Sequence, residues 1–301
     1  MRRRYEVWFL RMALADGGGA WWFRYLLTNP GRGGCAGKIQ GMPVQVWATW
    51  FPSGGKPQSF IAQLSLAELN ISGKGQAAFR FQAGANEIGE NYCRGLLNVD
   101  GHRIGWDLHY RSAFHVTLSS KGWIGFSRTP HSDAVFSGEI TLDGHKVAAD
   151  PLGFGVQGHN CGYRHRNFWR WTHAYFPRGS AAASTFEALV YEMPFGLVFR
   201  KAVLWHDGQA HIFRGLRETS TSREDMQWNL SCRSRTGVRL EAAIDGRGPS
   251  VRRLPYMKTD CSGIFEVANN SLASASIVIE KRACPAEKLE TRGGAVLEFV
   301  G

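Results

Sequence analysis

The sequence predicts an all-β protein built from two consecutive antiparallel β-barrels. Apolar and polar residues alternate in short stretches along the chain of 301 residues, 36 glycines supply turns between the stretches, and helical periodicity is nearly absent. So many closely spaced strands must hide their edges, either by closing into barrels or by packing as sandwiches. The chain is long enough for two units of about 150 residues each, which favours two barrels.

The first half of the chain predicts a series of hairpins. Residues 5 to 10 (YEVWFL) and 20 to 27 (AWWFRYLL) are rich in strand-forming residues and flank the glycine loop of residues 17 to 19. A third strand is predicted over residues 43 to 51 (PVQVWATWF), and residues 64 to 69 give a hint of one short helix. Further strands are predicted over residues 76 to 83 and 102 to 111, and over the SGEIT and KVAA segments that the Asp143-Gly144 turn signal joins.

The second half also predicts a series of short strands, although its residues do not repeat those of the first half. Its predicted strands are STFEALVYEM, LVFRKAVLW, AHIFRGL, MQWNLSCRS, VRLEAAI, SASIVIEKR and AVLEFV. Proline and glycine interrupt the strand pattern in residues 150 to 155 (DPLGFG), so we place the boundary between the two barrels there. The predicted domains are residues 1 to 150 and 151 to 301.

Composition and charge limit the partners of the protein. The formal net charge is +11, but the basic residues are scattered singly between aromatic residues and no nucleic-acid-binding motif appears. We therefore expect no nucleic-acid partner, and a weak peripheral attraction to anionic lipid at most. No apolar run is long enough to cross a bilayer and no signal-peptide cleavage site appears, so the expected location is the cytoplasm.

Several enzyme classes lack their motifs in this chain. There is no GxSxG, no P-loop and no convincing GxGxxG element, which argues against serine hydrolases, P-loop enzymes and dinucleotide-dependent oxidoreductases. The six cysteines include no CxxC pair, so we expect thiols rather than a disulfide framework or a zinc knuckle. The sequence accordingly predicts no cofactor.

The stretch GHNCGYRHRNFWRWTHAYF, residues 158 to 176, is unusually rich in histidine, arginine and tryptophan. Histidine and cysteine side chains can bind zinc, but the spacing of His159, Cys161, His165 and His173 matches no standard site. A nucleophilic Cys161 activated by a neighbouring histidine is an alternative of similar weight. We therefore predict no metal site, and expect His159 and Asn160 to form hydrogen bonds at a turn.

Strand alternation sorts the side chains that follow. Trp169, Trp171, His173 and Tyr175 share one face, and on the next strand Glu187 shares a face with Tyr191. If Glu187 lines an apolar cavity, desolvation raises its pKa and makes it a candidate general acid. The alternative is a glutamate on an outer face that meets water.

The predicted strand over residues 102 to 111 poses the same question in the first half. Trp106 belongs to its apolar face, whereas Asp107 and His109 belong to its polar face. A polar strand face usually meets water, but small ligand-binding barrels can turn polar residues inward. Asp107 is therefore a candidate catalytic residue, and Trp106 a candidate substrate contact.

Four segments together resemble a known family. They are YEVWFLRMALADGGGAWWFRYLL, GHNCGYRH followed by FWRWTHAYF, STFEALVYEMPFG and AVLEFVG. In this order they resemble the lipocalin-like family of hydroxyneurosporene synthase (carotenoid 1,2-hydratase) and AttH-like proteins, with more distant similarity to tocopherol cyclase and lipocalin-like Diels–Alderases. The resemblance implies two successive lipocalin-like (calycin) β-barrels with an apolar cavity.

The resemblance also implies roles for particular residues. Trp169 and Trp171 match an aromatic pair of the hydratases, and Phe186-Glu187 stands where a Tyr-Asp pair carries the aspartate thought to protonate the polyene. The sequence departs from the family by losing that tyrosine. It departs again at Cys161, in His-Asn-Cys-Gly, where the family has tryptophan or arginine.

We therefore expect an enzyme without a cofactor that acts on a hydrophobic isoprenoid or polyketide-like substrate by acid-initiated hydration or cyclisation. Glu187 would donate the proton, with His173 or Tyr191 as its partner. The expected substrate contacts are Trp169, Trp171, His159, Asn160, Trp106 and Tyr175. A carrier of a lipophilic molecule, without catalysis, is the alternative, and a scaffold with filled barrels is a third interpretation.

Overall fold

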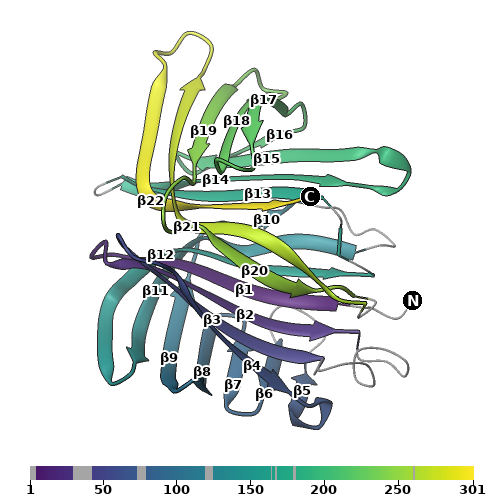
Figure 1. Ribbon diagram of the computed structural model, residues 1–301. Coiled ribbons are helices and arrows are strands. Elements are labelled where there is room, and N and C mark those ends of the chain that lie inside the picture. Colours follow the sequence, from purple (N-terminus) through teal and green to yellow (C-terminus); the bar gives the residue numbers. More distant parts are fainter. Residues whose placement is uncertain are drawn as a thin grey trace.

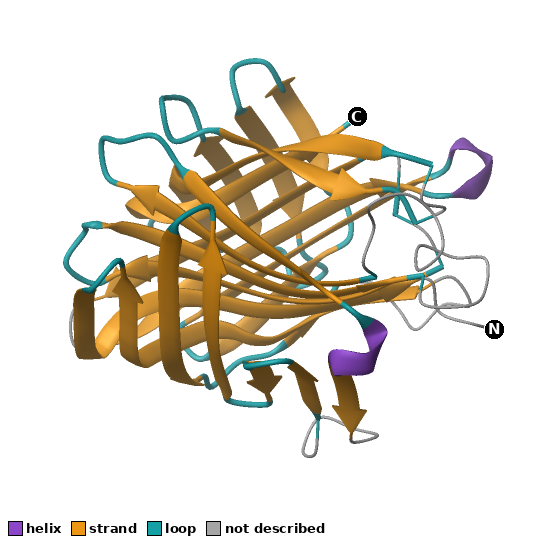
Figure 2. Cartoon of the chain, turned by 60° about the horizontal axis from the view of Figure 1, so that its bottom comes forward, coloured by secondary structure: helices purple, strands orange, loops and turns teal. Residues whose placement is uncertain are grey.

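The structure is a computed structural model that describes residues 5–29, 43–72, 79–118, 125–163, 165–166, 168–178, 181–259 and 262–301. These residues form two antiparallel sheets that lie one above the other in Figure 1, the first coloured purple to teal and the second green to yellow. Apart from short 3-10 helices, the described chain is strand and connecting turn (Figure 2). The predicted all-β fold of two lipocalin-like barrels is confirmed.

The first sheet has 12 strands among the described residues, in the order β4-β3-β2-β1-β12-β11-β9-β8-β7-β6-β5, with β10 on β11. The 3-10 helix η2 (Leu66–Glu68) links the two end strands, β4 and β5, where the sequence hinted at a helix. The strands are β1 (Tyr5–Leu14), β2 (Gly19–Thr28), β3 (Val44–Pro52), β4 (Gln58–Leu64), β5 (Leu69–Ser72), β6 (Arg80–Ala83), β7 (Asn86–Gly89), β8 (Tyr92–Val99), β9 (His102–Arg111), β10 (Val116–Thr117), β11 (Gly125–Leu142) and β12 (His145–Gly162).

The second sheet has 10 strands among the described residues, in the order β16-β15-β14-β13-β22-β21-β19-β18-β17, with β20 on β21. The 3-10 helix η4 (Pro194–Gly196) lies between β14 and β15. The strands are β13 (Trp169–Arg178), β14 (Ala181–Glu192), β15 (Val198–His206), β16 (Gln209–Phe213), β17 (Arg217–Ser222), β18 (Gln227–Arg233), β19 (Arg239–Asp245), β20 (Arg252–Met257), β21 (Ile264–Glu280) and β22 (Glu287–Val300).

The predicted glycine hairpin is present. Gly17 has φ of +76°, a left-handed conformation that glycine adopts without steric cost, and it lets β1 turn back into β2. The two strands pair in register from Ala13 opposite Ala20 to Tyr5 opposite Thr28. Of the strand predicted over residues 76 to 83, residues 76 to 78 lie outside the described part of the chain, and the rest supplies β6.

The chain changes sheets later than the sequence predicts. The predicted boundary at residue 150 falls inside β12, and the chain leaves the first sheet after Gly162 and enters the second at Trp169. Pro151 is tolerated inside β12 because the ladder with β11 is irregular opposite it, between the pairs Phe136–Gly153 and Gly138–Ala149. A residue without an N–H therefore breaks no regular pairing there.

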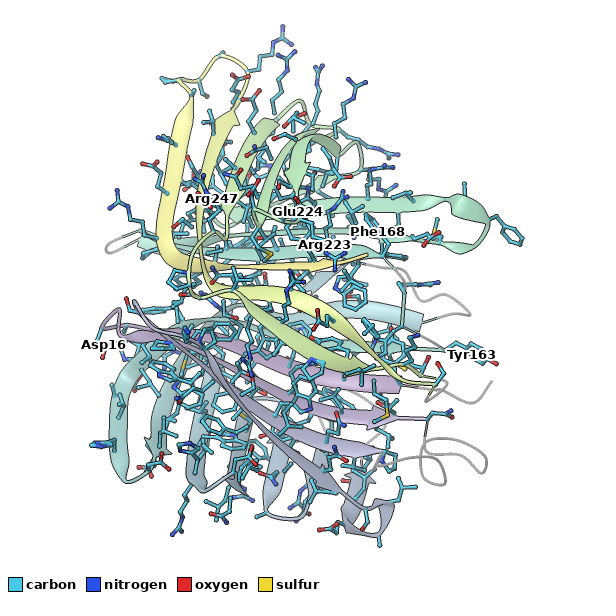
Figure 3. The ribbon with its side chains drawn as sticks, viewed as in Figure 1. Asp16, Tyr163, Phe168, Arg223, Glu224 and Arg247 are labelled. Atoms are coloured by element: carbon cyan, nitrogen blue, oxygen red, sulfur yellow. The ribbon has the colours of Figure 1, made fainter. Side chains whose placement is uncertain are left out.

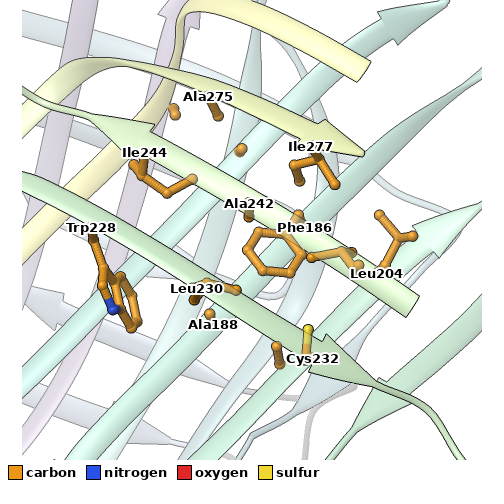
Figure 4. Packing of buried hydrophobic residues seen from close by; sticks show 14 of the residues in the cluster. Phe186, Ala188, Leu204, Trp228, Leu230, Cys232, Ala242, Ile244, Ala275 and Ile277 are labelled. Carbon is orange, nitrogen blue, oxygen red and sulfur yellow. The ribbon is translucent and has the colours of Figure 1, made fainter. Parts of the chain in front are cut away.

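Apolar side chains form three cores rather than two. One core fills the first sheet's interior, a second fills the second sheet's interior (Figure 4), and a third lies between the sheets. On β1, Leu10 belongs to the first interior whereas Val7 and Phe9 belong to the core between the sheets. Strand β1 is thus buried on both faces, and the two barrels are joined by a substantial hydrophobic interface.

Cysteine burial follows the same cores. Cys93 and Cys232 are buried, and desolvation raises the pKa of both thiols, that of Cys232 to about 12, so both stay protonated at neutral pH. Cys35 and Cys261 lie outside the described residues. No helix in the described part of the chain has the length and apolar character required to cross a membrane.

A buried arginine ties the two sheets together. Arg11 on β1 is fully buried, and its guanidinium donates five hydrogen bonds of 2.5 to 3.1 Å to the carbonyl oxygens of Ser271, Gly293, Gly294 and Ala295. The ladder between β21 and β22 is irregular in this region, which leaves carbonyl groups for Arg11. Although burial lowers the pKa of Arg11 to about 9, the side chain stays charged at neutral pH.

Removing this guanidinium should destabilise the protein strongly. In Arg11→Met the buried carbonyl groups lose their donors, and we expect the free energy of unfolding to fall by about 3 kcal/mol or more. Urea denaturation followed by circular dichroism measures the change. The exposed Arg103→Met serves as the control and should stay within about 0.5 kcal/mol of wild type. An Arg11→Met protein as stable as this control would contradict the role given to Arg11.

Candidate functional site

The candidate site is a cavity of about 140 Å³ between the two sheets. Its walls come from β1, β2, β11 and β12 of the first sheet and from β13, β14, β20 and β22 of the second. Figure 3 shows side chains of both sheets meeting in this region, with Tyr163 at the end where the chain crosses between them. The cavity therefore belongs to neither barrel interior, both of which are filled by apolar side chains.

The cavity shares two lining residues with a second recess. His165 and Arg166, on the segment that links the two sheets, line both the cavity and a recess of about 560 Å³. Lys258 and Phe265 are among the other residues of that recess. The segment that links the two sheets thus forms part of the wall of both spaces.

Aromatic rings make up much of the inner wall. Trp171 meets Phe9 edge to face at 5.4 Å between ring centroids, and meets Trp22 in the same way at 6.0 Å. Trp169 packs beside Tyr256 at 6.2 Å. The structure thus brings the two tryptophans predicted as substrate contacts, Trp169 and Trp171, to the wall of one cavity.

Glu298 on β22 supplies an acid to this wall. Its side chain is buried, Trp169 Nε1 donates to its Oε1 at 2.6 Å, and Asn269 Nδ2 and Tyr256 Oη lie 3.3 and 3.4 Å from its Oε2. Burial raises the pKa of Glu298, although the positive charge of Arg24 and these hydrogen bonds oppose the rise. A carboxyl that holds its proton more tightly than usual is suited to general acid catalysis.

Arg24 on β2 is the second charged group of the wall. It is buried, its Cζ lies 3.8 Å from the ring centroid of Tyr256, and the Trp47 ring is 4.8 Å away. Our sequence interpretation missed both Arg24 and Glu298. The available signal was a single charge between apolar residues on strands that otherwise read as core, in WFRYL and VLEFV.

Glu187 on β14 lies behind the cavity wall. It is buried, and its Oε1 accepts hydrogen bonds from Trp171 Nε1 at 2.9 Å and from Thr129 Oγ1 at 2.8 Å. Its Oε2 has no hydrogen-bond partner among the described residues, and burial raises its pKa to about 7. Glu187 therefore faces the core between the sheets rather than water, and contacts the cavity wall through the Trp171 indole.

The predicted partners of Glu187 are placed differently from one another. His173 lies opposite Glu187 in the β13–β14 ladder, but its Nε2 donates to the carbonyl oxygen of Ser132 at 2.6 Å. Burial lowers the pKa of His173 to about 3, so the ring is neutral. Tyr191 lines the cavity. Tyr175, predicted as a substrate contact, is not among the lining residues and stacks on Phe154 with 5.1 Å between centroids.

The structure separates His159 from Asn160. Both lie in β12, paired with β1, and not in the turn that the sequence predicts, because β12 extends to Gly162. His159 stacks on Trp8, and its Nε2 lies 3.0 Å from a carboxylate oxygen of Glu6. Successive side chains of a strand point to opposite faces, so Asn160 points away from the Trp8 side and lines the cavity.

The candidates from the first half lie away from the cavity. Trp106 on β9 is 4% exposed and fills the first barrel, where its Nε1 donates to Tyr25 Oη at 2.9 Å. The side chain of Asp107 is 60% exposed, on the opposite face of β9. The structure therefore brings neither Trp106 nor Asp107 to the site, because β9 belongs to the first barrel and contributes no residue to the cavity wall.

The histidines and cysteine weighed as metal ligands do not converge in the described structure. The one close group of three candidate ligands among the described residues is His206, Asp207 and Glu287 on the second sheet. His206 Nε2 lies 2.9 Å from Glu287 Oε2 and 3.1 Å from Asp207 Oδ2, and Nδ1 lies 2.9 Å from Ser184 Oγ. Hydrogen bonding between these groups accounts for the arrangement.

Solved structures of several proteins share this architecture, among them the three that follow. CghA, also crystallised with Sch210972, aligns with 98% of this chain and 87% of its own at 11% identity, with a TM-score of 0.65. Kievitone hydratase from Nectria haematococca aligns over 99% and 89% at 12% identity and a TM-score of 0.59. A protein assigned as AttH from Nitrosomonas europaea aligns over 99% and 92% at 12% identity and a TM-score of 0.52.

These identities establish a shared fold and nothing finer. The AttH structure agrees in fold with the AttH-like resemblance that the sequence indicates, whereas the likeness to hydroxyneurosporene synthase stays a prediction. No protein-family model and no curated protein sequence matches the chain.

The raised pKa of Glu187 predicts a pH-dependent stability. Its folded-state value of about 7 exceeds the ordinary 4.5, so the folded state binds this proton more tightly than the unfolded state. The resulting stabilisation is complete below pH 4.5 and is lost as the pH rises through 7, a change of about 3 kcal/mol. In Glu187→Gln this component should vanish.

Urea unfolding between pH 4.5 and 8 tests this prediction, with the difference between wild type and Glu187→Gln as the readout. Taking the difference removes the contributions of other titrating groups. A difference that stays constant with pH would show that the Glu187 carboxyl is not perturbed.

Proposed function

We propose that this protein is an enzyme that works without a cofactor and catalyses acid-initiated hydration or cyclisation of a hydrophobic substrate in the cavity between its barrels. The observation that carries the proposal is a carboxyl group with a raised pKa, Glu298, in the wall of an aromatic cavity. The substrate class we propose is an isoprenoid or polyketide-like molecule.

The residues of the cavity wall define the proposed reaction. Glu298 donates its proton to a carbon–carbon double bond or to an oxygen of the substrate, which leaves a cationic centre on the substrate and a carboxylate on the protein. The faces of Trp169 and Trp171 stabilise that positive charge. In hydration, a water molecule then adds to the cation and returns a proton to the carboxylate; in cyclisation, a second double bond of the substrate adds instead and a proton is lost to the carboxylate.

Glu187 is the second candidate acid. Its carboxyl also has a raised pKa, but it reaches the cavity wall through Trp171 Nε1 rather than directly. We therefore assign proton donation to Glu298, and to Glu187 the positioning of Trp171. The sequence-based assignment of Glu187 as the donor is the competing hypothesis, and the same experiment separates the two.

Two solved neighbours support this class of function. One is named as a hydratase, and CghA was crystallised with a small molecule, Sch210972. A carrier that binds a lipophilic molecule without changing it is the alternative, because an apolar cavity alone is compatible with both roles. Only turnover distinguishes them.

The proposal predicts a selective loss of turnover. A lipophilic extract of the host is incubated with wild type, Glu298→Gln or Glu187→Gln, and products are followed by liquid chromatography and mass spectrometry. We expect one component to gain the mass of water, or to change retention at constant mass. Glu298→Gln should slow this change about 100-fold or more, because it removes the general acid, while native mass spectrometry still detects the bound molecule.

The exposed Glu241→Gln is the matched control and should react like wild type. If Glu187→Gln abolishes turnover while Glu298→Gln does not, the acid is Glu187. Binding of an extract component without turnover by wild type would make the protein a carrier.

A further inference from the structure

Arg24 is a buried cation for which the described part of the chain supplies no hydrogen bond and no ion pair. Its side chain is 3% exposed, and its Nη1 has no hydrogen-bond partner among the described residues. No carboxylate oxygen of the described chain lies within 4.0 Å of the guanidinium to form an ion pair. Arg11 differs, because each of its three guanidinium nitrogens donates to at least one backbone carbonyl. A buried charge is ordinarily paired, so the pairing group of Arg24 is missing from the described part of the chain.

The neighbouring acid does not fill this role. The carboxyl of Glu298 is engaged by Trp169, Asn269 and Tyr256 rather than by Arg24. Arg24 is instead held by the Tyr256 ring, 3.8 Å from Cζ, and by the more distant Trp47 ring. These contacts with aromatic faces offset part of the cost of burying the charge, but they accept no conventional hydrogen bonds from the edge of the guanidinium.

A second donor without an acceptor lies beside Arg24. Trp22 is two residues earlier on β2, so both side chains project from the same face of the strand toward the cavity. Trp22 is 3% exposed, and its Nε1 has no acceptor among the described residues. Two positions on one face of β2, two residues apart, thus carry N–H donors without an acceptor among the described residues, one of them charged, and both side chains line the same cavity.

We infer that the ligand of this cavity carries an anionic oxygen group, a carboxylate or an enolate, which Arg24 and Trp22 bind, on an otherwise apolar body. An arginine guanidinium matches such a group in both charge and geometry. The apolar remainder lies against Phe9, Trp171 and Leu189. This inference rests on the proposed function for the location of the ligand, and it narrows the substrate from hydrophobic molecules in general to acidic amphiphiles.

Matched probes test the inference by isothermal titration calorimetry. The probes are 4-phenylbutyrate and 4-phenyl-1-butanol, which share an apolar body and differ in the acidic group. At pH 7 and low salt, wild type should bind the acid at least about tenfold more tightly than the alcohol. In Arg24→Met the affinity for the acid should fall to that for the alcohol, while the affinity for the alcohol stays unchanged.

Two further variants separate a specific role of Arg24 and Trp22 from a general effect of positive charge or of the aromatic ring. Arg166→Met removes another positive charge of the cavity wall and should keep the preference for the acid. Trp22→Phe keeps an aromatic ring but loses the N–H, and should weaken binding of the acid several-fold without affecting the alcohol. If Arg24→Met does not fold, the Trp22→Phe variant tests the inference in its place.

Equal affinities of wild type for the two probes, no binding of the acid at millimolar concentration, or a preference that follows Arg166 would each overturn the inference. The proposed function fails separately. Turnover of an extract component with no preference for the acidic probe would leave the proposed function standing without this inference. A clear preference combined with unimpaired turnover by Glu298→Gln would leave the ligand assignment standing without the acid assignment.

Discussion

The hydrogen bonds of Arg11 fix how the two barrels sit against each other, and the cavity depends on that arrangement. The guanidinium crosses from β1 to backbone carbonyls that irregular pairing of β21 and β22 leaves available. Each carbonyl would be costly to bury without a donor, so sliding of one sheet over the other is strongly disfavoured. The site draws its wall from both sheets and can keep its shape only while this contact holds.

Buried polar groups at this interface divide according to whether the protein satisfies them. Arg11 has hydrogen bonds on its whole guanidinium and acts as structure. Arg24, on the paired strand β2, has no hydrogen bond among the described residues, and Glu187 has one carboxyl oxygen without a partner there. Because the described chain supplies acceptors to one buried arginine and none to the other, we interpret the second as a ligand-binding group. The unsatisfied groups lie in or directly behind one cavity wall, which is where ligand chemistry is expected.

Alternation along strands predicted much of the fold and part of the site. It placed Trp169 and Trp171 on one face and Glu187 on the same side as Tyr191, as the structure has them. It could not tell which face meets the second barrel, because an interior core and a core between barrels produce the same pattern. Trp106 and Trp171 look alike in sequence, yet only one lines the cavity. Arg24 and Glu298 lie more than 270 residues apart, so only tertiary structure shows them together.

A crystal structure of the protein with 4-phenylbutyrate tests the central claim, that ligands bind between the barrels, most directly. The account predicts the phenyl ring against Trp171 in the inter-sheet cavity, with the carboxylate within hydrogen-bonding distance of Arg24. A ligand found inside either barrel, or an unoccupied cavity with the ligand bound on the outer surface, would contradict it.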